Sequence, residues 1–227
     1  CYGGGVAMNV KANGVALEES KIQNLFVPLS PSDESNAIGA AYYSLEKKLV
    51  KNGENPNKKL FPIPNAYLGK KIENDDIKKA ILNYKIDSEN FIILDGNKSK
   101  IRFIEKIISG SVVARCVGRE EFGQRSLGNR SILAMPNINN IVEKINFKIK
   151  YRDFWMPFCP VILEDHFSEY IQNCNPENSR FMTTAYKTIS DKRDLIKGGI
   201  HPADYTARPQ ILNAKINKQL YEIMIEI

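Results

Sequence analysis

A short apolar segment that runs into a loop of glycines and arginines constrains this chain more than any other feature. Residues 112–117 (VVARCV) are rich in β-branched side chains and end at Gly118, which predicts a β-strand. The following residues, 118–133 (GREEFGQRSLGNRSIL), contain three glycines, which allow tight turns and close approach of the backbone to a ligand. Its arginines, Arg119, Arg125 and Arg130, match phosphate or carboxylate oxygens. The pattern indicates either an anion-binding loop or a basic surface loop.

Length, charge and cysteine content restrict the class of protein. The 227 residues suffice for one large domain or two small ones, and no apolar run approaches the roughly 18 to 20 residues that span a bilayer. We therefore expect a globular cytoplasmic protein. The net charge of +6 is mild for a nucleic-acid binder and suits a protein that handles small anions. The cysteines form no Cys-x-x-Cys pair, so we expect buried free thiols at Cys1, Cys116, Cys159 and Cys174.

The two ends of the sequence suggest a fragment. Position 1 is not methionine, shows no signal-peptide pattern and lies just before the glycines at 3–5. A helical pattern that begins near Lys215 is still running at Ile227. We therefore expect that N-terminal and C-terminal parts are both missing.

Hydrophobic periodicity predicts a mixture of helices and strands. Strands are expected at 25–29, 91–94, 112–117, 158–163, 180–188 and 210–212. Helices are expected from Ile38 to Lys51, after a cap at Asp75 or Asp76, from Ser99 with Ile101, Ile104, Ile107 and Ile108 inward, from Pro136 to Ile149, and from Lys215. The proline-rich residues 52–64 are a candidate linker. The sequence thus predicts an α/β protein with domains at 1–72 and 73–227.

Five segments in order along the chain resemble the NodU/CmcH-type O-carbamoyltransferases. They are 4–9 (GGVAMN), 33–41 (DESNAIGAA), 118–136, 145–152 (INFKIKYR) with 157–160 (PFCP), and 201–210 (HPADYTARPQ). The resemblance implies that 1–72 is the tail of an actin-like (ASKHA) domain and that 73–227 is a YrdC-like α/β domain lacking its end. It implies that carbamoyl adenylate is made from carbamoyl phosphate and ATP with Mg²⁺. The carbamoyl group would then pass to a hydroxyl group of a sugar or natural product.

The residues of these segments, taken alone, leave simpler structural roles open. Gly4 and Gly5 suit a tight turn, Asp33 a helix N-cap, and Lys150 a helix C-terminus favoured by the macrodipole. The resemblance implies a Lys-x-Arg phosphate element at Lys150 and Arg152. It implies further contacts to carbamoyl phosphate or nucleotide at Arg125, Arg208, Arg130, Arg119, Asn129, Gly4, Gly5 and Asn9.

A metal site is implied by the resemblance alone. It places a metal-binding aspartate at Asp33, with two histidines from a preceding region that this sequence lacks. Two imidazoles and a carboxylate would suit iron, zinc or manganese. The chain departs from the family at Ser35, where glycine is usual, and at Met156, where many members have an arginine that would bind phosphate. Arg130 or Arg119 is expected to take the place of that arginine, and the fragment alone is expected to be inactive.

Three rival hypotheses remain. A threonylcarbamoyl-adenylate protein of tRNA modification would share both fold types, but it needs an RNA-binding surface that the mild charge argues against. A hydrogenase-maturation carbamoyltransferase would, by resemblance, carry the opposite module order and Cys-x-x-Cys zinc elements. A degenerate binding module is suggested by Met156 and Ser35. The favoured hypothesis predicts small-molecule substrates and a hydroxyl-bearing acceptor as partners, with neither nucleic acid nor membrane.

Overall fold

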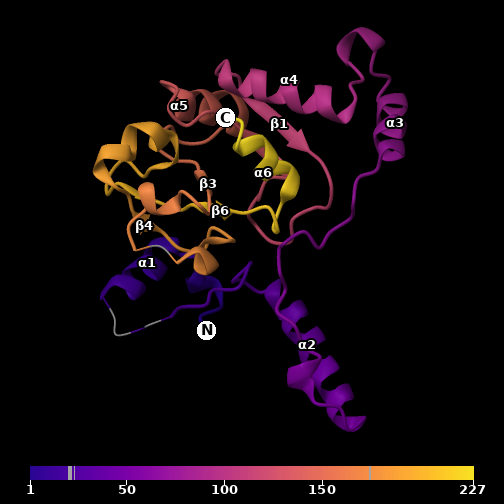
Figure 1. The fold of residues 1–227 in the computed structure, drawn as a ribbon, viewed down its shortest axis with the longest axis vertical. Helices are drawn as coiled ribbons and strands as arrows, with labels where there is room; N and C mark the ends of the chain where they lie inside the picture. The colour runs from indigo at the N-terminus through magenta and orange to yellow at the C-terminus, as the bar shows by residue number, and fades with distance from the viewer. Residues whose placement is uncertain (20–21, 23, 174) are drawn as a thin grey trace.

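The computed structural model is a mixed α/β protein, as predicted, and describes residues 1–19, 22, 24–173 and 175–227. In Figure 1, α2 extends away from the body of the molecule. The helices within these residues are α1 (Val10–Glu19), α2 (Ser35–Lys51), α3 (Asn74–Asn83), α4 (Gly96–Ile108), α5 (Ile141–Ile145) and α6 (Lys218–Met224). The strands are β1 (Val113–Cys116), β2 (Arg130–Leu133), β3 (Val161–Leu163), β4 (Tyr186–Lys187), β5 (Thr206–Ala207) and β6 (Gln210–Leu212).

The strands of the described residues pair two by two. β1 and β2 are antiparallel, with Cys116 opposite Arg130, so they close the base of the glycine- and arginine-rich loop. β3 and β6 are parallel, with Val161 opposite Gln210, and β4 pairs with β5 in antiparallel orientation. Because parallel strands begin at the same edge, the residues just before β3 lie beside those just before β6. This pairing brings together two segments far apart in the sequence.

Buried apolar side chains form clusters that link distant parts of the chain. One cluster joins Leu29, Ala66, Leu127 and Met182, and another is built around Ile162, Ile171 and Ile211. The first cluster contains residues from both sides of position 72. The division into domains at 72 stays a prediction, and packing continues across that position.

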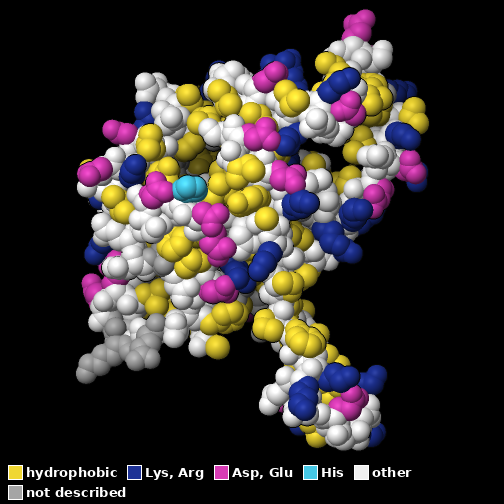
Figure 2. Space-filling view, viewed as in Figure 1, with side chains coloured by type: hydrophobic (Ala, Val, Ile, Leu, Met, Phe, Trp, Pro, Cys, Tyr) yellow, Lys and Arg dark blue, Asp and Glu magenta, His cyan; other side chains and the backbone are white. Residues whose placement is uncertain are grey.

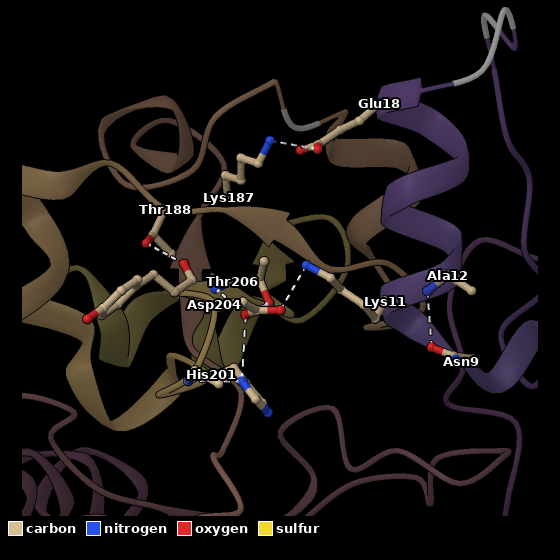
Figure 3. Close-up of polar contacts among 11 residues, drawn as sticks. Asn9, Lys11, Ala12, Glu18, Lys187, Thr188, His201, Asp204 and Thr206 are labelled. Atoms are coloured by element: carbon tan, nitrogen blue, oxygen red, sulfur yellow. Dashed lines mark hydrogen bonds and ion pairs between the residues drawn. The ribbon is translucent and has the colours of Figure 1, made fainter.

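Helix α1 is fixed to the 185–206 region by polar contacts that Figure 3 shows. Lys11 Nζ lies 2.8 Å from Asp204 Oδ2, and Lys187 Nζ lies 2.9 Å from Glu18 Oε2. Burial opposes ionisation of Asp204, but hydrogen bonds from Lys11 and Thr206 outweigh it and lower the pKa of Asp204 to about 2. Asp204 is therefore ionised at neutral pH.

Gly14 lies where α1 passes the backbone of Ala185. A Cβ atom at position 14 would lie 2.2 Å from the Ala185 carbonyl oxygen, which is closer than van der Waals contact allows. Gly14→Ala should therefore lower the free energy of unfolding by about 2 kcal/mol, as overpacking does. Gly39→Ala in α2 is the matched control, because an added Cβ there meets nothing within 4 Å. It should raise stability by about 1 kcal/mol, since alanine favours a helix. Equal urea midpoints for the two variants would contradict this account.

Two predicted strands are absent from the described structure. Residues 25–29 are in no β-ladder, although Leu25, Val27 and Leu29 are buried on one side of the segment. Residues 91–94 also pair with nothing, and Ile92 and Ile93 are 77% and 85% exposed. The alternation of buried and more exposed side chains at 25–29 thus reflects burial of one side of an extended segment. The apolar run at 91–94 has no partner strand among the described residues. The expected strand at 180–188 is reduced to β4.

Helix ends also differ from the predictions. The cap of α3 is Glu73, whose N–H donates to Asp76 Oδ2 at 3.1 Å. Helix α4 starts before Ser99, because Asp95 Oδ1 accepts from the Lys98 N–H at 2.8 Å. Local carboxylates thus set both starts.

Three further expectations need correction. Ile104 and Ile107 are buried as predicted, but Ile101 and Ile108 are exposed. The helix expected from Pro136 is a short α5 followed by a π-helical turn, Asn146–Lys150, and α6 ends before Ile227. The described cysteines are not buried, because Cys1 and Cys116 are exposed and Cys159 is half-buried; the prediction for Cys174 lies outside the described residues.

The projecting helix α2 carries a basic end. Figure 2 shows Lys and Arg side chains gathered at the far end of this projection, where Lys47, Lys48 and Lys51 lie. Among its 17 residues Leu49 alone is classed as buried. None of the helices in the described part of the chain is both long and apolar enough to cross a bilayer.

Candidate functional site

Four of the predicted cations meet in one cavity of about 240 Å³, here called the cationic cavity. It is lined by Arg125, Lys150, Arg152 and Arg208, together with Ser131, Phe158, Cys159 and Gln210 among others. The arginines are half-buried and Lys150 is exposed. A cavity that concentrates positive charge in this way favours a multiply charged anion, because each guanidinium offers paired donors to its oxygens.

Arg125 reaches the cavity from a loop that an internal carboxylate organises. Glu121 Oε1 accepts from the backbone N–H groups of Leu127, Asn129 and Arg130 at 2.9, 2.7 and 3.1 Å. Gly128 has a φ of 109°, which other residues rarely adopt. Burial lowers the pKa of Arg125, and the nearby charge of Arg208 lowers it further. An anion between these two arginines would relieve that repulsion.

Arg130, Arg119 and Asn129 lie outside the walls of the cationic cavity and support the loop. The Arg130 guanidinium donates to the carbonyls of Val117 and Gly118, and Arg119 Nη1 donates to the Gly69 carbonyl at 2.9 Å. Asn129 is buried, and its Nδ2 donates to the Arg119 carbonyl at 2.8 Å. These groups satisfy backbone carbonyls, and the replacement of an arginine at position 156 by Arg130 or Arg119 stays a prediction.

Arg152 is oriented by Asn146, a fully buried residue that opens the π-helical turn. Asn146 Oδ1 accepts from Arg152 Nε at 2.6 Å. Its Nδ2 lies 3.1, 3.3 and 2.8 Å from the carbonyl oxygens of Asp153, Phe154 and Met156. One amide therefore holds both the guanidinium and the loop that carries it. Arg152 also lies over the Phe158 ring, 4.5 Å from its centroid.

Arg208 enters through the parallel pairing of β3 and β6. It lies just before β6, and Cys159 lies just before β3. Arg208 Nε and Nη2 donate to Cys159 Sγ at 3.0 and 2.7 Å. The thiol thus fixes the guanidinium at the wall of the cavity.

The predicted nucleotide turn at Gly4, Gly5 and Asn9 lies beside the loop but outside the cationic cavity. Gly4 has a φ of 91°, and both glycines are exposed. Asn9 Oδ1 accepts from the Ala12 N–H at 3.0 Å at the start of α1 (Figure 3). A small hollow next to Met8 is also lined by Arg125, which places this turn near the cations.

Asp33 is an exposed residue in the turn before α2. The cap position of α2 is Glu34, whose carboxylate accepts from the Ser30 hydroxyl, so the predicted cap at Asp33 is wrong. Within the described residues no three His, Cys, Asp or Glu side chains gather as a metal site would require. Asp33 can therefore supply one oxygen ligand, and the metal stays a prediction.

Sequence reasoning missed the residues that hold the cations in place. Glu121, Asn146 and Cys159 belong to segments quoted for the resemblance, and Gln210 ends one of them. Asn146 carries a usable signal, because it is a polar residue beside Ile145 in an apolar helical pattern. A polar side chain buried in such a pattern must bond to something nearby.

Comparisons with known proteins identify the family. The model described as Carbamoyltransferase C-terminus matches residues 104–227, and the model described as Carbamoyltransferase N-terminus matches residues 1–42. An uncharacterized protein of Methanocaldococcus jannaschii is 38% identical, with coverage of 97% of this chain and 40% of its own length. Nodulation protein NolO of Bradyrhizobium diazoefficiens is 30% identical (99% and 39%), and nodulation protein U of Sinorhizobium fredii is 26% identical (100% and 36%).

The chain thus spans 40% or less of the length of these three relatives. The C-terminal model alone covers more than half of the chain, and all five predicted motifs lie within the matched regions. The chain therefore belongs to the carbamoyltransferase family.

Proposed function

We propose that this chain is part of an ATP-dependent O-carbamoyltransferase. The protein forms carbamoyl adenylate from carbamoyl phosphate and ATP and transfers the carbamoyl group to a hydroxyl of a sugar or natural product. The observation that carries the proposal is the convergence of Arg125, Lys150, Arg152 and Arg208 on one cavity. The proposal includes an actin-like tail at 1–72, a YrdC-like domain at 73–227 and a cytoplasmic location.

Carbamoyl phosphate and ATP both carry phosphate groups, and this accounts for the several cations in the cationic cavity. Water cleaves carbamoyl phosphate to carbamate and phosphate, and a carbamate oxygen then attacks the α-phosphorus of ATP, so that carbamoyl adenylate forms as the bond to pyrophosphate breaks. The guanidiniums hold the phosphate oxygens and stabilise the charge that builds on them during transfer. AMP is a better leaving group than hydroxide, and its attachment makes the carbamoyl carbon reactive toward an acceptor hydroxyl. No step requires a covalent bond to the protein.

Divalent metals enter the proposal in two places. Mg²⁺ accompanies ATP, and iron, zinc or manganese would bind Asp33 with ligands from outside these residues. Such a metal would polarise an oxygen of the substrate during transfer to the acceptor. The part of this chain is to supply one carboxylate at the turn before α2.

Pyrophosphate release tests the proposal directly. The complete gene product, supplied with ATP and Mg²⁺, should release pyrophosphate when carbamoyl phosphate is added and should release none above background without it. Radiolabelled carbamoyl phosphate should give a labelled adenylate that decays on addition of hydroxylamine. If the rate of pyrophosphate release is the same with and without carbamoyl phosphate, the proposed activity is contradicted.

A further inference from the structure

A buried amide in the wall of the cationic cavity carries an oxygen with no partner among the residues that the structure describes. Gln210 is the first residue of β6, is 2% exposed and lines the cavity beside Arg208. Its Nε2 donates to the Leu127 carbonyl oxygen at 2.8 Å. Because a carbonyl can only accept, this bond fixes which end of the amide faces Leu127. The Gln210 Oε1 atom therefore faces away from Leu127, and within the described residues no group donates to it.

The four cations of the cavity offer only donors, whereas Gln124, Ser126 and Ser131 carry acceptor oxygens as Gln210 does. The three arginines and Lys150 have N–H groups and no acceptor. Ser131 is also buried, but its Oγ already accepts from the Gly128 N–H at 2.9 Å. Gln210 Oε1 is thus an unpaired acceptor on a buried side chain that lines the same cavity as the cations. A ligand that satisfies the whole wall has anionic oxygens for the cations and one N–H group for Gln210.

The distance between the anionic oxygens and the N–H group within a ligand indicates which class of ligand fits the cavity. In carbamoyl phosphate, the amino group is attached to the carbon that carries the oxygen bridging to phosphorus, so the N–H donor lies next to the phosphate. In ATP the amino group of adenine is separated from the phosphates by the ribose, and it would not reach an acceptor inside the phosphate-binding wall. Acetyl phosphate has the same charge but carries a methyl group where the amino group would be.

We propose that Gln210 recognises the amino group of carbamoyl phosphate and so selects it over acyl phosphates that lack an N–H. The inference rests on the proposed function, because it assumes that this phosphate enters the cationic cavity. When a methyl group is placed against the oxygen, this acceptor remains unpaired and loses contact with water, which disfavours the methyl-bearing ligand. A preference of about tenfold for carbamoyl over acetyl phosphate is expected from one such bond.

Gln210→Met is the informative variant, because methionine has a similar length but neither donor nor acceptor of useful strength. Equilibrium binding of carbamoyl phosphate and of acetyl phosphate would be measured on the complete gene product. The wild-type protein should prefer carbamoyl phosphate about tenfold. The variant should lose this preference while its affinity for acetyl phosphate changes little, because the cations remain.

Tyr67→Phe is the matched control. Tyr67 donates through its hydroxyl to the same Leu127 carbonyl, at 2.7 Å, but it does not line the cavity. Removal of the Tyr67 hydroxyl tests whether loss of one hydrogen bond to the Leu127 carbonyl is enough to change the preference between the two ligands. The variant should keep the preference for carbamoyl phosphate. Gln210→Glu is a second variant, which keeps an acceptor oxygen in the cavity but adds a negative charge. It should weaken both ligands and keep the preference.

The outcomes separate failure of the inference from failure of the proposed function. If wild-type protein binds carbamoyl phosphate but Gln210→Met retains the preference, or Gln210→Glu loses it, the role of Gln210 is overturned. A fall in ATP affinity with an unchanged carbamoyl preference would overturn it too and would assign the amide to the nucleotide. If the wild-type protein does not bind carbamoyl phosphate at all, the proposed function fails with it.

Discussion

Replacing Arg125 by alanine should lower the affinity for carbamoyl phosphate by about 30- to 100-fold, which is the loss expected for a charge-assisted pair of hydrogen bonds. The side chain is half-buried, and its pKa is lowered by burial and by the charge of Arg208. A bound anion should therefore stabilise the charge of Arg125 more than it would stabilise the charge of an exposed side chain. Lys150→Ala should cost only about tenfold, because Lys150 is exposed and water competes for its contacts. Titration of the complete gene product with carbamoyl phosphate measures both losses.

Arg102→Ala is the control for removal of a positive charge. Arg102 is on α4, forms an ion pair with Glu105 at 3.4 Å and does not line the cationic cavity. Its loss should leave binding unchanged, whereas a general electrostatic effect would lower affinity in all three variants by a similar factor. Normal binding by both Arg125→Ala and Lys150→Ala would show that the cationic cavity is not the phosphate site.

Asn146→Ala should lower the free energy of unfolding by about 3 kcal/mol and weaken phosphate binding as well. Its side chain is fully buried and bonds Arg152 Nε and the carbonyls of the loop that follows. Removing the amide leaves these groups without a partner and frees the guanidinium to leave the cavity. Urea unfolding measures the first effect, and titration with carbamoyl phosphate measures the second.

A double-mutant cycle separates positioning from general loss of stability. If Asn146 acts on binding through Arg152, Asn146→Ala should weaken phosphate binding little further in an Arg152→Ala background. Fully additive losses would mean that Asn146 affects binding by another route. Asn139→Ala is the surface control, since Asn139 is exposed and its side-chain hydrogen bond among the described residues is from Lys197 Nζ, at 2.5 Å. Its effect on stability should be under about 0.5 kcal/mol.

Local sequence patterns predicted two of the elements, and the family resemblance supplied the cations of the site. The β-branched run at 112–117 became β1, and the periodic apolar residues up to Lys51 became α2. The resemblance supplied the four cations of the cavity, which the structure brings together. Each of these predictions depends either on residues that are close in the sequence or on a family pattern. Neither kind of information requires knowledge of tertiary contacts.

The contacts of Gln210 and Arg208 could not be predicted because each joins residues that are far apart in the sequence. Gln210 and the Leu127 carbonyl are 83 positions apart, and Arg208 and Cys159 are 49 apart. Nothing local distinguishes such a glutamine from one on the surface. The apolar run at 91–94 failed for a related reason, since a strand needs a partner and the described residues provide none.

The carboxylate of Glu121 has a consequence for the thermodynamics of recognition. It gathers three backbone N–H groups of the loop that presents Arg125, as a bound anion would. The conformational entropy of ordering this loop is therefore lost when the chain folds and not when a ligand arrives. A phosphate would bind to a loop that is already ordered, so little of the free energy of each guanidinium contact would be offset by the entropy of ordering the loop.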